Sequence, residues 1–530
     1  MPSIDLAEAA VAVHVAAQTV DAGLASIRSV DEDQVLAYDV AHAASAVATA
    51  RVLLDYGTRG DLEARLACAF IADAIHDIAT RVLGREELWG VGRGALDPAH
   101  QFVSTYRAPS FVASLAGVDG PRHLDDFFEL VRDSFRRFSD DKIKPVAEHV
   151  HRTNADVPES ILSGLADLGG FGLSIPEEYG GGAIGEANDY LAMVIATEEL
   201  SRGSLGIGGS LITRPEILTR ALVRGGTPEQ KSHWLPQLAS GETLVAVAVT
   251  EPDYGSDVAG VRVSAVRDAN GWRINGTKTW CTFAARADVL MLLARTDPST
   301  TNHKGLSCFI VPKPPGDGHG FSFAQQPGDD GGAPGGGAMQ GRAIDTIGYR
   351  GMHSYEIAFD NWWVSSDNLI GNEAGIGRGF YLQMEGFENG RLQTAARAVG
   401  LMQAAYEAAC AYAADRVVFG KAIAEFELTR AKLGRMAFLI TAARQFAYHV
   451  SDLMSRGEGM LEASMVKAYV CRAAEWVTRE ALQIHGGMGY AEEYAVSRYY
   501  VDARVLSIFE GADETLCLKV IARRLLDARQ

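Results

Sequence analysis

The sequence predicts an α+β protein that is mostly helical, because the hydrophobic periodicity changes twice along its 530 residues. Apolar residues recur every three or four positions as far as residue 243, alternate with polar residues over 244–370, and return to the helical spacing from 371 onward. The pattern predicts a helical N-terminal extension (1–120), a helical domain (121–243), a small β domain (244–370) and a C-terminal helical bundle (371–530).

The helical regions show both amphipathic spacing and recognisable helix starts. In the extension, "QVLAYDVAHAASAVATARVLLDYG" and "LEARLACAFIADAIHDIATRVLG" carry apolar residues at helical intervals. In the second region, Thr227 is followed by Pro228 and, three residues after it, by Gln230, which is the pattern of a capping box. The C-terminal region contains three long Ala-, Leu- and Met-rich segments and a final helix from about residue 512, which together predict a bundle of four helices.

The β domain is predicted by a series of short runs rich in β-branched and aromatic residues. They are "TLVAVAVT", "VRVSAV", "WRINGTKTWCT", "DVLMLLART", "LSCFIVPK" and "YEIAFDNWWV", with "DANG" at 268–271 as a hairpin turn. The glycine-rich stretch 327–341 is expected to be a mobile surface loop. A phosphate-binding loop is the alternative, although no Lys-Ser or Lys-Thr follows it.

Composition narrows the class of partner. The formal net charge of −18 argues against nucleic acid, whose binding needs a surplus of Lys and Arg. The N-terminus lacks a basic leader and no apolar run approaches the length of a membrane span, so we expect a protein of the cytoplasm without membrane attachment. The six cysteines lie singly, which predicts neither disulfides nor a metal site.

Three segments combine polar side chains with glycines at the ends of elements: 248–260, 275–282 and 483–511. The first is compatible with an ordinary turn. In the second, Trp280 and Thr282 are two residues apart on a predicted strand and are expected on one face, which would suit a flat heterocycle that needs stacking and a hydrogen bond. In the third, a glycine-rich break joins two helices and permits close backbone approach to a ligand.

Glu510 stands out within the third segment because it lies between apolar residues and Gly511. A carboxylate at the start of a helix most often caps that helix or forms a salt bridge. The functional interpretation is a general base whose apolar neighbours keep it dry and whose glycine lets a substrate approach closely.

In this order and spacing, "AVTEPDYGSD", "NGTKTWCT" and "QIHGGMGY...IFEG" resemble the acyl-CoA dehydrogenase family over about residues 122–530. The resemblance implies that the β domain is barrel-like, that FAD is the cofactor, that the enzyme is a homodimer or homotetramer, and that electrons pass to an electron-transfer flavoprotein. It also implies α,β-desaturation of a short branched acyl-CoA, with (2S)-methylsuccinyl-CoA and mesaconyl-CoA of the ethylmalonyl-CoA pathway as expected substrate and product. Another acyl-CoA dehydrogenase, an acyl-CoA oxidase and a catalytically silent scaffold are the alternatives.

The resemblance also assigns roles to residues. Glu510 is the implied base, with hydride transfer to flavin N5, and Gly511 lets the acyl group approach it. Arg391 is implied at CoA, while Arg202, Arg214 and Tyr490 are candidates for the acyl end, where a second carboxylate would need a cation. The implied FAD contacts are Val249, Thr250, Ser256, Trp280 and Thr282, together with Arg416, Phe419, Gln483, Gly486 and Gly487 across a subunit contact. Ala512 and Glu514 depart from the hydroxyl and amide that are common after the base.

Overall fold

The computed structural model describes residues 4–183, 189–316, 318–326 and 336–529. Contacts within the chain divide it into two compact units. The first unit comprises Met1–Arg137, Thr197–Gly203 and Arg391–Gln530, and the second comprises Phe138–Ala196 and Ser204–Gly390. Three helices contribute residues to both units, namely α6 (Asp126–Phe138), α9 (Asp189–Gly203) and α12 (Gly379–Asp415). The four domain boundaries inferred from the sequence stay predictions.

The first unit is helical. Its other helices are α1 (Leu6–Ser26), α2 (Gln34–Gly57), α3 (Asp61–Val82), α4 (His100–Tyr106), α5 (Pro109–Ala113), α13 (Glu427–Ser455), α14 (Met460–His485), α15 (Ala495–Leu506), α16 (Asp513–Thr515) and α17 (Ala522–Asp527). A short hairpin of β9 (Val417–Val418) and β10 (Lys421–Ala422) follows α12.

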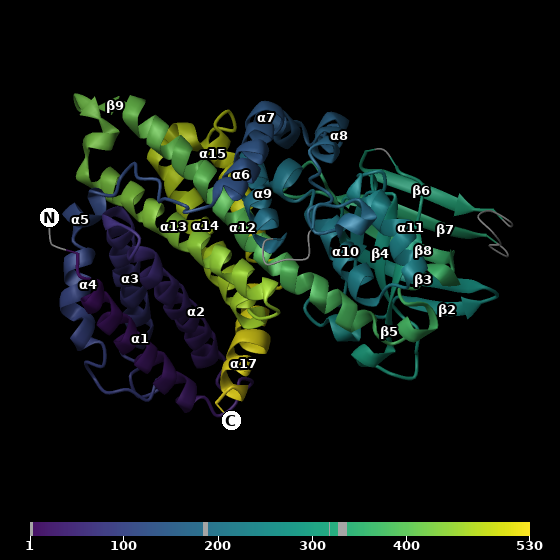
Figure 1. Cartoon of the computed structure of the whole chain (residues 1–530), viewed down its shortest axis with the longest axis horizontal. Coiled ribbons are helices and arrows are strands. Elements are labelled where there is room, and N and C mark those ends of the chain that lie inside the picture. The colour runs from purple at the N-terminus through teal and green to yellow at the C-terminus, as the bar shows by residue number, and fades with distance from the viewer. Residues whose placement is uncertain (1–3, 184–188, 317, 327–335, 530) are drawn as a thin grey trace. The chain divides into compact units, whose positions relative to one another are not determined.

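The predicted N-terminal extension is helical and packs directly on the C-terminal helices. Asp5 caps α1 by accepting hydrogen bonds from the backbone N–H groups of Ala7 and Glu8. Helix α2 packs against α1, α3, α13 and α14, and alanine is the commonest residue at its buried positions, which allows close approach of the neighbouring helices (Figure 1). The extension therefore belongs to the same helical core as α13 and α14.

The second unit is built on a curled sheet. The strands are β1 (Val245–Ala248), β2 (Ser264–Asp268), β3 (Gly271–Thr282), β4 (Val289–Arg295), β5 (Leu306–Pro312), β6 (Gly320–Gln325), β7 (Gly337–Ile344) and β8 (Ser354–Ser365). They follow the order β1-β4-β2-β3-β8-β7-β6, and β5 pairs with β4. Helices of this unit are α7 (Lys144–Thr153), α8 (Glu159–Asp167), α10 (Thr213–Gly225) and α11 (Pro228–Ala239).

The sequence predicted the helix starts and most strands of the second unit correctly. Thr227 and Gln230 form the expected capping box at α11, with the Gln230 N–H donating to Thr227 Oγ1 over 3.3 Å. The predicted turn at 268–271 joins β2 and β3, and Asp268 pairs with Gly271. An apolar core that includes Leu218, Leu235 and Met291 packs α10 and α11 against the sheet.

The expectation of a surface loop throughout 327–341 is wrong at its C-terminal end. Residues 337–341 begin strand β7, while 327–335 lie outside the described residues. Gly341 pairs with Phe321 on β6, and a Cβ atom at Gly341 would lie 2.2 Å from the Phe321 ring. The aromatic ring covers the glycine, so a glycine-rich sequence forms a strand here.

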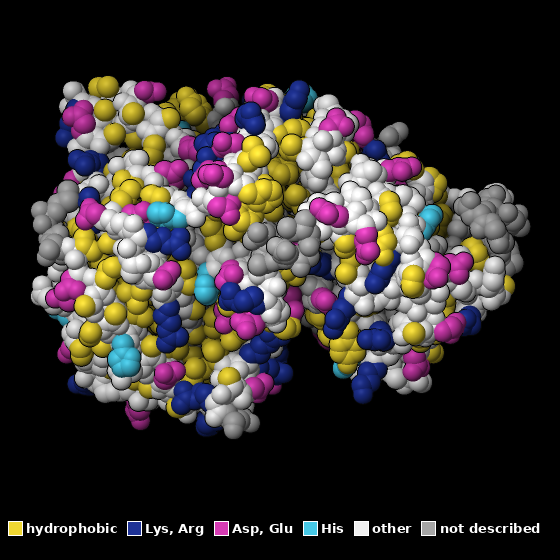
Figure 2. Space-filling view, viewed as in Figure 1, with side chains coloured by type: hydrophobic (Ala, Val, Ile, Leu, Met, Phe, Trp, Pro, Cys, Tyr) yellow, Lys and Arg dark blue, Asp and Glu magenta, His cyan; other side chains and the backbone are white. Residues whose placement is uncertain are grey.

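Charged side chains of both signs are interspersed on the face that Figure 2 draws. Within the described ranges, no helix has both the length and the apolar character needed to cross a membrane.

Candidate active site

The predicted base lies on a backbone corner between α15 and α16. Glu510 has φ +53°, a left-handed conformation that is costly for a residue other than glycine, and Gly511 follows with φ +99°. The Glu510 side chain is half-buried. Among the described residues, no protein acceptor meets the Glu510 backbone N–H. The corner therefore presents a carboxylate and an available N–H donor from the same residue.

A buried lysine supports this corner from α14. Lys467 is 0% exposed and its Nζ donates to the Gly511 carbonyl over 2.6 Å. Burial lowers the pKa of Lys467, while the carboxylates of Asp513 and Glu510 act in the opposite direction and Arg391 lowers it further. The structure thus brings three predicted site residues, Glu510, Gly511 and Arg391, into the surroundings of one buried ammonium group.

The apolar residues before Glu510 shield it only in part. Phe509 is half-buried, and the Arg397 guanidinium lies 4.6 Å from the centre of its ring. Ile508 is 53% exposed. The dry environment that the sequence predicts for the base is therefore not provided by Ile508, and Glu510 itself is half-buried.

Arg391, the predicted CoA contact, is buried on α12. Its Nη1 donates to Ser464 Oγ over 3.2 Å, and Ser464 lies one helical turn before Lys467 on α14. This contact fixes the arginine beside the same part of α14 that supports the Glu510 corner.

In the second unit, the predicted flavin-binding strand is held by an ion pair. Lys278 on β3 is 0% exposed, and its Nζ lies 2.9 Å from Glu251 Oε1 and 2.7 Å from the Val249 carbonyl. The Thr279 N–H also donates to the Thr250 carbonyl over 2.8 Å. The predicted FAD contacts Val249 and Thr250 therefore lie directly beside β3.

Trp280 and Thr282 do not keep the regular alternation from which a common face was predicted. The β3–β8 pairing shifts register between Lys278 and Cys281, and Trp280 has φ +59°. The Trp280 side chain is 55% exposed, whereas Thr282 is 7% exposed and its Oγ1 lies 3.0 Å from Ser354 Oγ. The indole ring is exposed at this bulge, while the threonine hydroxyl already has a protein partner.

The remaining predicted FAD contacts are exposed. Phe419, with φ +51° and 97% of its surface exposed, forms the tip of the β9–β10 hairpin together with Gly420. Gly486 and Gly487 follow α14, and a Cβ at either position would meet no heavy atom within 4 Å. The exposed residues among the predicted FAD contacts are Ser256, Arg416, Phe419, Gln483, Gly486 and Gly487, and Tyr490, which is a candidate for the acyl end, is exposed as well.

The two arginines predicted for the acyl end differ in their partners. Arg202 is 6% exposed, and its Nε lies 2.9 Å and 3.0 Å from the two carboxylate oxygens of Glu407. Arg214 is also 6% exposed, but its only partner among the described residues is the Ser210 carbonyl at 3.3 Å. Within the described ranges, Arg214 is therefore a buried cation without a carboxylate partner.

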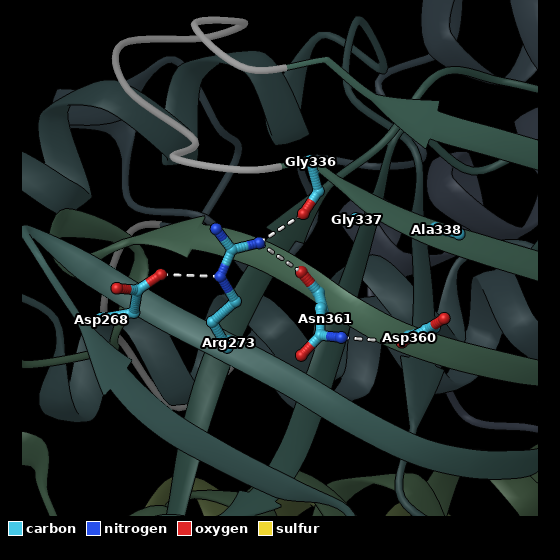
Figure 3. Close-up of a pocket in the computed structure, with 7 residues that line it drawn as sticks. All are labelled: Asp268, Arg273, Gly336, Gly337, Ala338, Asp360 and Asn361. Carbon is cyan, nitrogen blue, oxygen red and sulfur yellow. Dashed lines mark hydrogen bonds and ion pairs between the residues drawn. The ribbon is translucent and has the colours of Figure 1, made fainter.

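A separate hollow of about 440 Å³ lies at the ends of the β strands (Figure 3). Arg273 crosses it and donates to Asp268 Oδ2 over 2.7 Å and to the Asn361 carbonyl over 2.8 Å. The charged and polar groups that line this hollow form hydrogen bonds with one another. None of the lining residues is a predicted site residue, so we assign the hollow no role.

Sequence reasoning missed Lys278 and Lys467. The available signal was a single lysine inside an otherwise apolar or strand-forming segment, in "GTKTW" and "SMVKAYV". Lysine is almost never fully buried without a specific partner, so each of these positions could have been flagged.

The Glu510 corner of the first unit and the exposed indole of the second are each features that a flavin-dependent oxidoreductase would need. Family models of acyl-CoA dehydrogenases match residues 126–242 (N-terminal domain), 246–362 (middle domain) and 377–526 (C-terminal domain). The chain belongs to the acyl-CoA dehydrogenase family, which consists of FAD-dependent oxidoreductases. Residues before 126 lie outside all three matches.

Individual relatives agree with this assignment. The (2S)-methylsuccinyl-CoA dehydrogenase of Cereibacter sphaeroides is 46% identical over 410 residues, which cover 77% of this chain and 71% of that protein. The structure of glutaryl-coenzyme A dehydrogenase with glutaryl-CoA has a TM-score of 0.68 at 30% identity, covering 77% of this chain and 97% of that one. Butyryl-CoA dehydrogenase from Megasphaera elsdenii has a TM-score of 0.67 at 28% identity, covering 76% and 99%.

Proposed function

We propose that this enzyme oxidises (2S)-methylsuccinyl-CoA to mesaconyl-CoA, as in the ethylmalonyl-CoA pathway, with Glu510 as general base. The observation that carries the catalytic assignment is the strained corner at Glu510 and Gly511, which a buried lysine supports. Backbone strain of this kind persists where the surrounding structure enforces it, and it is concentrated at functional sites.

The reaction breaks one C–H bond at each of two adjacent carbons and forms a double bond between them. The Glu510 carboxylate takes the proton from the carbon next to the thioester. The Glu510 N–H, which has no protein acceptor among the described residues, is available to donate to the thioester oxygen as negative charge develops there. One residue thus supplies both the base and part of the charge stabilisation.

The described residues fit FAD. The indole of Trp280 is exposed by a bulge, and Gly486 and Gly487 leave open space beside their backbone. When bound, FAD supplies the acceptor for the second hydrogen, taken as hydride. The residues proposed to hold it are Val249, Thr250, Ser256, Trp280 and Thr282, with Arg416, Phe419, Gln483, Gly486 and Gly487 contributed by a second copy of the chain.

Arg214 is the better candidate for the second carboxylate of the substrate. A buried guanidinium is stabilised by a carboxylate partner, and Arg202 already has one in Glu407 whereas Arg214 has none among the described residues. The names of two relatives refer to acyl groups with a second carboxylate, methylsuccinyl and glutaryl. Arg391 is proposed to contact CoA. We also propose that the enzyme is a homo-oligomer and that an electron-transfer flavoprotein accepts its electrons.

The base assignment is tested by Glu510→Gln in the purified holoenzyme. We expect yellow protein with normal flavin content whose flavin is not bleached by methylsuccinyl-CoA in a stopped-flow experiment. Glu458→Gln, at an exposed position, serves as the matched control and should bleach at the wild-type rate. Near-normal bleaching by the Glu510 variant would refute the assignment.

The substrate assignment is tested by Arg214→Met with two thioesters, methylsuccinyl-CoA and the uncharged 2-methylbutyryl-CoA. Loss of the cation should lower kcat/KM for the charged substrate by about a hundredfold, since a charged hydrogen bond contributes about 1.5–3 kcal/mol, and should spare the uncharged one. Arg202→Met should show no such selectivity. Equal losses on both substrates in the Arg214 variant would contradict the proposal.

Two alternatives, an acyl-CoA oxidase and a catalytically silent scaffold, can be tested with the same purified protein. Turnover of an acyl-CoA panel with an artificial electron acceptor, compared with oxygen alone, distinguishes a dehydrogenase from an oxidase. Colourless protein that cannot be reconstituted with FAD would favour a scaffold.

A further inference from the structure

The N-terminal extension reaches the segment that follows the proposed base. Tyr38 and His42 lie one turn apart on α2, so their side chains project from the same face of the helix. The Tyr38 hydroxyl donates to Asp513 Oδ2 over 2.5 Å, and His42 Nε2 lies 3.0 Å from the same oxygen. Both residues of the extension therefore hold one carboxylate, three positions after Glu510.

This contact is part of the protein interior. His42 is 4% exposed and Asp513 is 8% exposed, while the Tyr38 and His42 rings meet edge to face with their centres 4.7 Å apart. Burial alone would raise the pKa of Asp513, but the hydrogen bonds from His42 and Tyr38 outweigh it and the pKa is lowered. The Asp513 side chain therefore has its hydrogen-bond partners in the extension.

Asp513 in turn closes the loop that carries the base. Asp513 is the first residue of α16. Its backbone N–H donates to the Ser507 carbonyl over 3.1 Å, and this hydrogen bond closes a loop of residues 508–512. Within that loop Lys467 holds the Gly511 carbonyl from α14. The strained Glu510 corner therefore lies between two anchors, one provided by the helical bundle and one by the extension.

We propose that Tyr38 and His42 are positioning residues for catalysis, which fix the Glu510 loop by holding Asp513. The inference rests on the proposed role of Glu510 as base. It assigns a catalytic purpose to an extension that lies outside the three stretches matched by the family models. A displacement of the base by a fraction of a bond length is enough to slow proton abstraction, because the near-attack geometry is lost.

The same cluster contains residue types that bind transition metals. Cys517 Sγ lies 3.4 Å from His42 Nε2, and His42, Asp513 and Cys517 offer ligand atoms within 4.8 Å of one another. The hydrogen bonds among Tyr38, His42 and Asp513 account for the geometry without a metal. Zinc at one equivalent per chain, in protein purified without chelator, would replace this cluster by a metal centre and overturn the proposal.

The test uses the holoenzyme variants Asp513→Asn, Tyr38→Phe and His42→Gln, with whichever acyl-CoA bleaches the wild-type flavin fastest. We expect Asp513→Asn to slow the maximal rate of flavin reduction by about tenfold or more, with flavin content and substrate KM close to wild type. Tyr38→Phe and His42→Gln should slow it in the same way, and neither should add a further loss in the Asp513→Asn background. Asp31→Asn is the matched control, because Asp31 also joins the extension to the C-terminal segment, through Lys519 and Arg523, but at an exposed position.

The outcomes distinguish this inference from the proposed function. Wild-type reduction rates in Asp513→Asn and Tyr38→Phe, or losses that simply add in the double variants, would overturn the positioning role. If Asp513→Asn does not fold, Tyr38→Phe decides, since it removes one oxygen atom only. If Glu510→Gln still bleaches, the base assignment fails regardless of these results; if only the extension variants behave as wild type, the base assignment stands and this inference fails.

Discussion

Two corners of the molecule, one in each unit, place a residue other than glycine at positive φ beside a fully buried lysine. At the flavin-side corner Trp280 has φ +59° and Lys278 is 0% exposed; at the base corner Glu510 has φ +53° and Lys467 is 0% exposed. Lys278 meets the Glu251 carboxylate at 2.9 Å. Lys467 donates to the Gly511 carbonyl at 2.6 Å, and among the described residues it forms no salt bridge.

The difference separates a structural use of buried charge from a functional one. Glu251 also accepts the backbone N–H groups of Arg262 and Val263 at 2.7 Å and 2.8 Å, so its ion pair with Lys278 connects three segments. Lys467 has the Gly511 carbonyl as its partner but no salt bridge among the described residues, and burial lowers the pKa of both lysines. Burying an ammonium group without a salt bridge is costly, and this one lies beside the corner at which we propose that Glu510 acts as a base.

The largest expected effect comes from breaking the compensated pair. Glu251→Gln should lower the free energy of unfolding by about 3–5 kcal/mol, because Lys278 would remain buried without a carboxylate. Urea unfolding followed by tryptophan fluorescence measures this, and the double variant Glu251→Gln/Lys278→Met should recover part of the loss. Glu356→Gln, exposed on β8 of the same sheet, should change the free energy by less than about 0.5 kcal/mol. A loss below about 1 kcal/mol in Glu251→Gln would remove the contrast between the two lysines.

Neighbouring carboxylates on α9 repeat the contrast with the opposite charge. Glu198 lies 2.9 Å from Arg444 Nε and 3.3 Å from Arg122 Nη2, whereas Glu199 comes no closer than 3.8 Å to Arg122 and Arg136. Burial and the charge of Glu198 raise the pKa of Glu199 to about 7, from 4.5. Between those pH values the folded state keeps a proton that the unfolded state releases, so this group reduces stability as the pH rises.

Glu199→Gln should therefore stabilise the protein at pH 8 by about 1–3 kcal/mol and have little effect at pH 5. Urea unfolding at the two pH values measures the difference. Glu198→Gln should destabilise at both, because it leaves Arg444 and Arg122 without their carboxylate. The same effect of Glu199→Gln at pH 5 and pH 8 would show that Glu199 does not titrate in this range.

Local sequence signals predicted the helices and most strands, and they failed where tertiary contacts decide. The capping residues of α11 are a local signal that the structure confirms, and the apolar run predicted as a strand forms β4, which is buried along almost its whole length. Strand β7 was not predicted because its sequence is rich in glycine. The ring of Phe321 on β6 covers Gly341, and this contact between strands is not visible in the local sequence of β7. The prediction that Trp280 and Thr282 lie on one face was wrong because a bulge interrupts β3.

The candidate site divides in the same way. Glu510 is singled out by a contiguous motif, and its role as base, like the roles assigned by resemblance to the other residues, stays a prediction. Asp513 could not be connected to His42 from the sequence, because 471 positions separate them and only the packing of α2 brings them together. A single lysine in an apolar or strand-forming segment marks Lys278 and Lys467 as candidates for burial, but only tertiary packing decides whether the ammonium group reaches water.

The smallest expected effect, and the sharpest test of the comparison, comes from Lys467. Lys467→Met removes the donor to the Gly511 carbonyl and should slow flavin reduction by about tenfold, equivalent to about 1.4 kcal/mol, while the cost of a buried charge disappears and stability changes little. Lys519→Met, at an exposed position on the same C-terminal segment, should stay within about twofold of wild type. Lys467→Gln keeps a hydrogen-bond donor but not the charge, so a rate near wild type would assign the effect to the hydrogen bond, and a rate equal to that of Lys467→Met would assign it to the charge. An unchanged rate in Lys467→Met would show that the base corner needs no lysine, and the two corners would then be alike only in their backbone.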